Sequence, residues 1–387
     1  MTLPRDRLDR LRNTMGRLGV EWVLTADPIN ITYATGVRNM NVFSMMGPAR
    51  LLLVGVEDTV VAWEFAGSEH LSQSSPLVDE VRTAPGLTAL SGSRHTDAID
   101  VFSTQIASLI GARPETRSSL AVERVDHDVT DALRSAGCSL SSATEVFVES
   151  RRIKLPDEIE VMDEAMSRVE AAVSMMLEQL RAGATEIEVW SHFQQHLIAN
   201  GGEYVSTRLV QAGPRTFPYF QEAGSTVIAD GDLFCVDTDA IGFGGYAVDF
   251  SRTYHVGPSE PSSDQRHLHA LALDQLEHNA SLIAPGVRFE EFARGAWDVP
   301  ARHRAFGYSS LAHGLGMCGE FPYVPVAVPD QAFPVDGEFE PNMVVCVESY
   351  IGDPERGEGV KLEDQYLVTD SGVRRMSSLP FDHRLSV

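Results

Sequence analysis

Three aspartates in the second half of the chain have the spacing of a cation-binding site. Asp237 and Asp239 are two residues apart in the β-like segment DLFCVDTDA, and Asp249 follows a glycine-rich turn. Side chains on a strand alternate with a period of two, so we expect the first two carboxylates on one face. A hairpin would bring Asp249 to them. Carboxylates so close together repel one another, and a cation among them would relieve that repulsion.

Two glutamates and a histidine further along the chain fit the same site. Glu348 lies in MVVCVESYI and Glu363 in VKLEDQYLV, apolar segments that predict buried strands, where an unpaired carboxylate is costly. His313 is flanked by glycines, which allow backbone or ligand to approach closely. If all six residues converge, five carboxylates carry −5 and two divalent cations return +4. This balance favours a binuclear centre of Mn²⁺, Fe²⁺, Co²⁺ or Zn²⁺.

The same residues also allow simpler interpretations. The pattern Asp-x-Asp followed by Gly242 imitates the start of a calcium loop, but the twelfth position would be Val248, which cannot be a ligand. The aspartates could instead be solvated turn residues, and a single histidine is most often a surface or core residue. The sequence contains no HExxH, GxSxG or P-loop motif and no GxGxxG after a strand, which argues against serine hydrolases and nucleotide-binding enzymes.

The elements that must position these residues fall into two parts. A length of 387 residues suggests two domains. Over residues 1–150 the pattern predicts an amphipathic helix that ends at Gly19, then strands and helices of an α/β domain. Near Glu149 the residue pattern changes to the basic patch RRIK, and a long helix follows Pro156. We therefore expect the second domain over residues 151–387, with further helices over 184–202 and 265–283 and strands that carry the acidic residues.

Composition excludes several classes of partner. Lys+Arg 31 against Asp+Glu 55 gives 31 − 55 = −24, so we expect no nucleic acid and no anionic membrane surface as partner. The four cysteines show no paired short spacing, which is typical of a reducing compartment. The N-terminal segment has charges every few residues and no apolar core of a secretory signal, and no apolar run reaches the ~20 residues that span a bilayer. These features predict a cytoplasmic protein.

The order Asp, Asp, His, Glu, Glu, with the segments GYAVDFSRT and VKLEDQYLVT, resembles the pita-bread (M24) metallopeptidase superfamily of prolidase, Xaa-Pro aminopeptidase and creatinase. The segments DPINITYATGVRNM and RRIKLPDEIEVM extend the resemblance over essentially the whole chain. The resemblance implies an N-terminal creatinase/prolidase-like α/β domain, a C-terminal pita-bread domain with a curved, mostly antiparallel sheet, and a homodimer. It also implies two divalent metal ions, whose ligands would be Asp237, Asp239, Asp249, His313, Glu348 and Glu363.

Within that superfamily the sequence is similar to a lyase subgroup that acts on dimethylsulfoniopropionate. That subgroup has the extra aspartate matched by Asp239 and a tyrosine five residues before the histidine, matched here by Tyr308. The tract TRLVQAGPRTFPYFQEAG is also similar. The chain departs from the subgroup at Gly319, where the lyase carries the aspartate that is its base. We align Phe43 with a tryptophan that contacts the substrate.

The peptidase pattern is also incomplete in this chain. Prolidase-type members have a histidine seven residues after the ligand histidine, where this chain has Glu320. They have another after a proline in a segment that reads here Phe217-Pro218-Tyr219-Phe220. Aromatic residues such as Tyr219 and Phe220 are more often core than pocket. Both imidazoles that would handle the substrate are therefore replaced.

These observations support three functional hypotheses, of which a hydrolase comes first. In it, a metal-activated hydroxide attacks a peptide or amide C–N bond of a small substrate, as in Xaa-Pro peptidases. Glu348 would handle the proton, Asp249 would bridge the metals, and Tyr308 and Glu320 would line the pocket. The first alternative is β-elimination that releases dimethyl sulfide from dimethylsulfoniopropionate, with Glu320 or another group as the base. The second is a non-catalytic binding protein on this fold.

Overall fold

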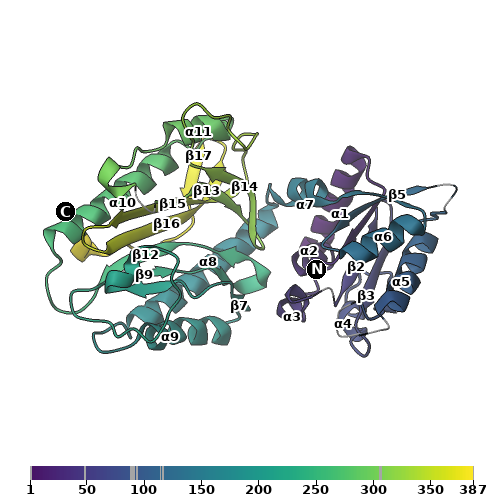
Figure 1. The fold of residues 1–387 in the computed structure, drawn as a ribbon, viewed down its shortest axis with the longest axis horizontal. Helices are drawn as coiled ribbons and strands as arrows, with labels where there is room; N and C mark the ends of the chain where they lie inside the picture. Colours follow the sequence, from purple (N-terminus) through teal and green to yellow (C-terminus); the bar gives the residue numbers. More distant parts are fainter. Residues whose placement is uncertain are drawn as a thin grey trace. The chain divides into compact units, whose positions relative to one another are not determined.

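The computed structural model describes residues 2–47, 49–87, 92, 95–113, 115, 117–304 and 307–386. The chain divides into two compact units, Met1–Arg151 and Arg152–Val387 (Figure 1). Each unit has its own sheet and its own hydrophobic core. No helix of the described residues combines the length and the apolar character needed to cross a membrane.

The first unit is built on a six-stranded mixed sheet in the order β4-β3-β2-β1-β5-β6. Antiparallel pairs join β1 to β2 and β2 to β3, whereas β3–β4, β1–β5 and β5–β6 are parallel. The strands are β1 (Trp22–Thr25), β2 (Leu51–Gly55), β3 (Val60–Glu64), β4 (Glu80–Thr83), β5 (Ser118–Glu123) and β6 (Cys138–Ser142).

Helices cover both faces of this first sheet (Figure 1). α5 and α6 pack on the face that includes Leu24 and Trp63. α1 buries the stripe Leu8, Leu11 and Met15, the face that its three- and four-residue spacing predicts. The helices are α1 (Thr2–Leu18), α2 (Pro28–Thr35), α3 (Asn41–Met45), α4 (His70–Gln73), α5 (His95–Leu109), α6 (His127–Ser135) and α7 (Thr144–Arg151).

The second unit is built on a curved antiparallel sheet in the order β14-β13-β15-β16-β12-β9-β8, with β17 paired to β16 (Figure 1). A smaller sheet joins β11, β10 and β7. The strands are β7 (Tyr204–Val205), β8 (Val210–Ala212), β9 (Leu233–Asp237), β10 (Ala240–Ile241), β11 (Ala247–Val248), β12 (Ser251–His255), β13 (Ser310–Leu315), β14 (Gly319–Pro325), β15 (Val344–Asp353), β16 (Glu358–Thr369) and β17 (Gly372–Arg375).

The two longest strands of this sheet divide their residues between two faces. Val345 and Val347 of β15 and Leu362 of β16 join the apolar core that α10 covers. The alternate residues Glu348 and Glu363, which are direct cross-strand neighbours, face the other side. The helices of this unit are α8 (Pro156–Leu177), α9 (Glu186–Ala199), α10 (Ser263–Ser281) and α11 (Phe289–Gly295).

This architecture confirms the predicted fold class, an α/β protein whose second part has a curved, antiparallel sheet. The long helix after Pro156 is α8, which begins with a proline in its first turn. The predicted helices over 184–202 and 265–283 are α9 and α10. These long periodic segments are the ones in which local pattern and tertiary packing agree.

Candidate metal centre

Strand pairing brings five of the six predicted ligands together on one face of the second sheet. Asp237 ends β9 opposite Ser251 of β12, so the hairpin expected around Asp249 forms. His313 lies in β13 beside β15, while Glu348 of β15 and Glu363 of β16 are direct neighbours. Four separate strands and one connecting segment therefore supply the five side chains.

Asp239 lies just beyond the strand that was expected to include it. β9 ends at Asp237, and Asp239 has a positive φ of 37° in the short segment between β9 and β10. Its carboxylate accepts a hydrogen bond from Thr207. The charges of Asp237 and Glu363 act on it, so it stays in the electrostatic environment of the cluster.

The imidazole of His313 lies at the centre of three carboxylates. Its Nε2 is 3.3 Å from Oε1 of Glu348 and 3.6 Å from oxygens of both Asp249 and Glu363. Burial by itself lowers the pKa of this ring, but the contacts with Glu348 and Glu363 outweigh it and raise the pKa well above its ordinary value. Without a metal, the ring itself is thus the cation that the carboxylates attract.

A second cation, Lys361, was not expected from the sequence. Its fully buried Nζ donates to Oε2 of Glu348 at 2.6 Å and to Oε2 of Glu363 at 2.8 Å. It also lies 3.8 Å from Asp237. Its place two residues before Glu363, on the same strand face, was the available signal. With Lys361 counted and His313 neutral, as a metal ligand is, five carboxylates and one ammonium sum to −4, the charge that two divalent cations would neutralise.

Several carboxylate oxygens of the cluster are buried without a hydrogen-bond partner among the described residues, which favours a bound metal ion. Asp237 Oδ1, Asp249 Oδ1 and Glu363 Oε1 are buried and have no hydrogen-bond partner in the described part of the chain. Burial, followed by the charge of Asp237, raises the pKa of Asp239 to about 7. Burial and the charge of Glu363 raise the pKa of Asp249 well above its ordinary value. Buried carboxylates with raised pKa values and unpartnered oxygens would gain both charge balance and a bonding partner from a divalent cation.

A chelating group of four residues also stands out within this cluster. One ligand atom from each of Asp249, His313, Cys346 and Glu363 lies within 4.8 Å of the other three. Burial, with the charge of Asp249 next, raises the pKa of the Cys346 thiol well above its ordinary value. The residues present therefore fit a divalent metal, and the predicted set is joined by a sulfur that the sequence analysis did not single out.

Aromatic rings surround the cation Lys361. Tyr219 donates from its hydroxyl to Asp237 Oδ2 at 2.5 Å, and Tyr308 has its ring centroid 5.1 Å from the Lys361 ammonium. The rings of Phe220 and Tyr308 stack with centroids 5.3 Å apart. Tyr219 thus touches a predicted metal ligand, although its residue type suggested a core position. Phe220 is exposed, with 64% of its surface accessible, so its ring can meet a substrate.

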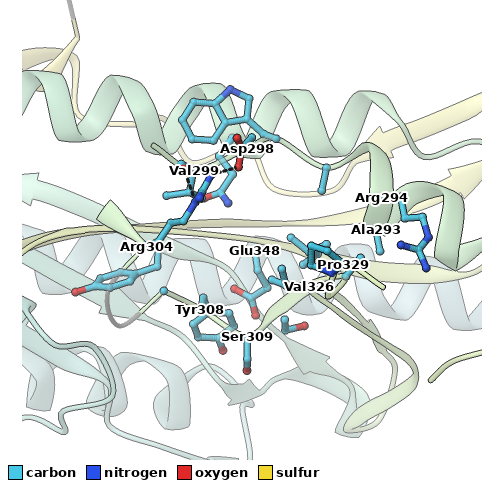
Figure 2. Close-up of a pocket in the computed structure, with 18 residues that line it drawn as sticks. Ala293, Arg294, Asp298, Val299, Arg304, Tyr308, Ser309, Val326, Pro329 and Glu348 are labelled. Atoms are coloured by element: carbon cyan, nitrogen blue, oxygen red, sulfur yellow. Dashed lines mark hydrogen bonds and ion pairs between the residues drawn. The ribbon is translucent and has the colours of Figure 1, made fainter. Parts of the chain in front are cut away.

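A pocket of about 670 Å³ reaches one carboxylate of the cluster (Figure 2). Its lining includes Glu348, Tyr308, Tyr350 and Trp297. Figure 2 shows the Glu348 carboxylate directed toward the side of the pocket where Tyr308 and Ser309 lie. Glu348 is therefore shared by the carboxylate cluster and the pocket, which is large enough for a small organic substrate.

Glu320 has other partners. Its carboxylate accepts from the buried Lys154 at 2.9 Å and from the backbone amide of Met317 at 3.1 Å. It is outside the described lining of the pocket in Figure 2. Its predicted role in handling substrate thus remains a prediction. At the neighbouring Gly319, an added Cβ would meet no atom within 4 Å.

The curved sheet and its carboxylate-rich cluster place the molecule in the class of metallopeptidase-like enzymes with the pita-bread architecture. The chain belongs to metallopeptidase family M24, whose model matches residues 160–370. This membership confirms the resemblance found in the sequence.

Relatives within the family carry two kinds of name. The chain is 36% identical over 371 residues to dimethylsulfoniopropionate lyase DddP of Roseovarius nubinhibens, a match that covers 94% of this chain and 83% of that protein. It is 32% identical to DddP of Roseobacter denitrificans, covering 98% and 87%. Dipeptidase PepE from Mycobacterium ulcerans, a solved structure, has a TM-score of 0.79 at 20% identity and covers 98% and 97%. This last likeness shows the fold alone.

Proposed function

We propose that the protein is a metal-dependent lyase that acts by β-elimination on a small carboxylate substrate, with dimethylsulfoniopropionate as the first candidate. Two relatives above 30% identity over nearly the whole chain are named as lyases for that compound. The sequence alone favours a hydrolase, and these relatives reverse that order. The sequence resemblance to the lyase subgroup at Asp239 and Tyr308 also supports the proposal.

The observation that carries the proposal is that Glu348 belongs both to the cluster and to the pocket. Its Oε2 is fixed by Lys361 at 2.6 Å, while Oε1 faces His313. Although burial raises the pKa of Glu348, the charge of Lys361 and the contact with His313 outweigh it and lower the pKa. The side chain is therefore an ionised carboxylate at neutral pH, held where a substrate in the pocket would meet it.

Residues of this chain can be assigned to metal binding, to proton acceptance and to binding of the sulfonium group. Two divalent metal ions, held by Asp237, Asp239, Asp249, His313, Glu348 and Glu363, would supply positive charge for the substrate carboxylate. In the reaction the α-carbon loses its proton to Glu348 and the electron pair of that C–H bond forms the Cα=Cβ double bond of acrylate. The Cβ–S bond breaks and its electron pair leaves with sulfur as neutral dimethyl sulfide. The rings of Tyr308 and Phe220 would attract the sulfonium cation through their π-faces.

Detection of dimethyl sulfide in the headspace tests this function. Purified protein is loaded separately with Fe²⁺, Mn²⁺, Co²⁺ and Zn²⁺ and given dimethylsulfoniopropionate. We expect metal-dependent release that falls by about 10² to 10⁴ in Glu348→Gln, the usual contribution of a positioned proton acceptor. Glu358→Gln, on the neighbouring strand β16, is the matched control because Glu358 pairs with Gln265 and Arg356 away from the cluster. Silence from a protein with two metals per chain would refute the lyase, and full activity in Glu348→Gln would refute Glu348 as the proton acceptor.

A hydrolase is the second candidate, and Gly319 is the observation that favours it. A reaction in which water attacks a C–N bond needs no aspartate at that position, because Glu348 would accept the proton of the water. Against it, Tyr219 and Glu320 occupy the positions of the peptidase histidines, and the structure commits both to other partners. Release of proline from Xaa-Pro dipeptides by the same metal-loaded samples separates the two reactions.

The remaining parts of the proposal concern the setting of the enzyme. We propose that it works in the cytoplasm as a homodimer, which the scarce cysteines and the family resemblance favour. A non-catalytic binding protein on this fold would bind metal and substrate analogues but turn over neither class of substrate. Sedimentation of the purified chain tests the dimer independently of any activity.

A further inference from the structure

Cys346 lies on the strand face that carries the candidate ligands. It is fully buried in β15, two residues before Glu348, so the two side chains point to the same side of the sheet. Val345 and Val347, on either side of it, point into the core under α10 instead. Across the sheet Cys346 is the direct neighbour of His313 in β13. The pairing of these strands therefore places Cys346 beside His313.

The atoms around this sulfur are those of a chelating site. Single atoms of Asp249, His313, Cys346 and Glu363 all lie within 4.8 Å of one another. First-row metal ions hold oxygen, nitrogen and sulfur at about 2.0 to 2.3 Å, so ligands on opposite sides of one ion are about 4.5 Å apart. The four atoms need only a small adjustment to surround one ion.

Unsatisfied carboxylate oxygens give independent support for a ligand at this place. Glu363 is fully buried, and its Oε1 has no hydrogen-bond partner in the described part of the chain; the same holds for Asp249 Oδ1. The other oxygen of Glu363 is already used by Lys361. Lys361 thus balances one oxygen of Glu363, whereas Oε1 of that carboxylate lies on the side of His313, 3.6 Å from Nε2 of that ring.

The other buried cysteine of this sheet shows the contrast. Cys235 in β9 has its Sγ 3.1 Å from the Thr253 hydroxyl and 3.5 Å from the Gly359 carbonyl, which is ordinary packing with hydrogen bonds. It is outside the four-residue group. Cys346 Sγ has the carbonyl oxygen of Asp249 at 3.6 Å. The two cysteines are equally buried but differ in what surrounds the sulfur.

We propose that Cys346 is a sulfur ligand to one of the two metal ions of the proposed enzyme, together with Asp249, His313 and Glu363. This rests on the metal centre of the proposed function, not on the substrate. A mixed sulfur, nitrogen and oxygen set favours Zn²⁺, Co²⁺ and Fe²⁺ over Mn²⁺ and Mg²⁺, which prefer oxygen ligands alone. Cys346 therefore determines which metal the centre selects.

Cobalt substitution tests this ligand without any assay of turnover. The full-length protein is stripped of metal and titrated with Co²⁺, and near-ultraviolet absorption is followed for a sulfur-to-cobalt charge-transfer band. We expect the band in the wild type and in the control Cys235→Ser, and its loss in Cys346→Ser. The same variant should lose about tenfold in the preference for Zn²⁺ over Mn²⁺, measured by competition.

Two outcomes would overturn the assignment. One is stoichiometric Co²⁺ binding by the wild type with no charge-transfer band, and the other is a band that persists in Cys346→Ser. If Cys346→Ser does not fold, X-ray absorption of the zinc-loaded wild type decides, because a sulfur scatterer at bonding distance must be present. A protein that shows the band but releases no dimethyl sulfide would refute the lyase and leave the sulfur ligand standing.

Discussion

Two buried charge clusters, one in each unit of the chain, are arranged in opposite ways. In the first unit, Arg50 and Glu64 are each 1% exposed and form a bidentate pair at 2.8 and 2.6 Å. The remaining donor of Arg50 binds the carbonyl of Asn39, and Ser72 donates to Glu64. In the second unit, five carboxylates share a single buried lysine and one imidazole. One cluster is neutral, whereas the other is short of positive charge.

This difference separates a structural use of buried charge from a functional one. A matched pair with all its hydrogen bonds made holds the surrounding strands in one arrangement and has nothing left to offer a ligand. A cluster with orphaned oxygens is stable only when protons or metal ions complete it. The comparison predicts that removing one charge will have opposite effects on folding in the two clusters.

The largest expected effect is on the neutral cluster. In Glu64→Ala, the Arg50 guanidinium would stay buried without its partner, and we expect a loss of about 3–5 kcal/mol in the free energy of unfolding. Urea denaturation followed by circular dichroism measures it. Glu80→Ala is the control, because its pair with Arg82 is largely exposed and should contribute little. A loss no greater than that of the control would mean that the buried pair is not structural.

The opposite sign is expected for the charged cluster. In metal-free protein at alkaline pH, Asp249→Asn removes a buried acid whose Oδ1 is unpaired and should stabilise folding by on the order of 1–3 kcal/mol. The same variant should bind Co²⁺ or Mn²⁺ much more weakly, as titration calorimetry would show. Destabilisation of the metal-free protein would contradict the claim that the centre is short of positive charge.

A third expected effect is the pH dependence of the metal-free protein. The pKa of Asp239 is raised to about 7 in the folded state from 3.8, so the folded state holds the proton over that range and the unfolded chain does not. The free energy of unfolding should therefore fall as the pH rises from about 4 to about 7, by up to about 1.4 kcal/mol per pH unit.

The other titrating groups of the cluster mostly reinforce this trend. The pKa values of Asp249 and His313 are also raised, which extends the loss of stability to higher pH, whereas the lowered pKa of Glu348 acts in the opposite sense. Denaturation curves at several pH values measure the slope. Asp239→Asn should reduce it between pH 4 and 7, and saturating metal should abolish it. A flat profile without metal would show that these acids are solvated.

The sequence singled out residues that the structure brings together because acids in apolar strands are conspicuous. Glu348 and Glu363 could be singled out from their neighbours alone, and the structure pairs them across β15 and β16. Lys361 and Cys346 escaped notice because a strand residue's face depends on register and on which strands become neighbours. The strand expected to run through Asp239 ends at Asp237, and Asp239 itself has a left-handed backbone conformation that the sequence pattern did not indicate.

The smallest expected effect on stability comes from the position where the chain departs most from its lyase relatives. The backbone of Gly319 does not require glycine, since its φ is outside the left-handed region and an added Cβ meets nothing within 4 Å. Gly319→Asp should thus change the free energy of unfolding by no more than about 0.5 kcal/mol. Gly319→Asn is the matched control, with the same size and no charge.

The same substitution separates the two candidate reactions. If the centre carries out elimination with Glu348 as the acceptor, a carboxylate at position 319, where the lyase subgroup has its base, adds a second base, and dimethyl sulfide release should rise in Gly319→Asp but not in Gly319→Asn. If the centre hydrolyses C–N bonds, the added charge has no proton to accept and release of dimethyl sulfide stays at background in both variants. A rise confined to the aspartate would therefore show that the centre binds the sulfonium substrate productively, and that Gly319 limits the rate rather than changing the reaction.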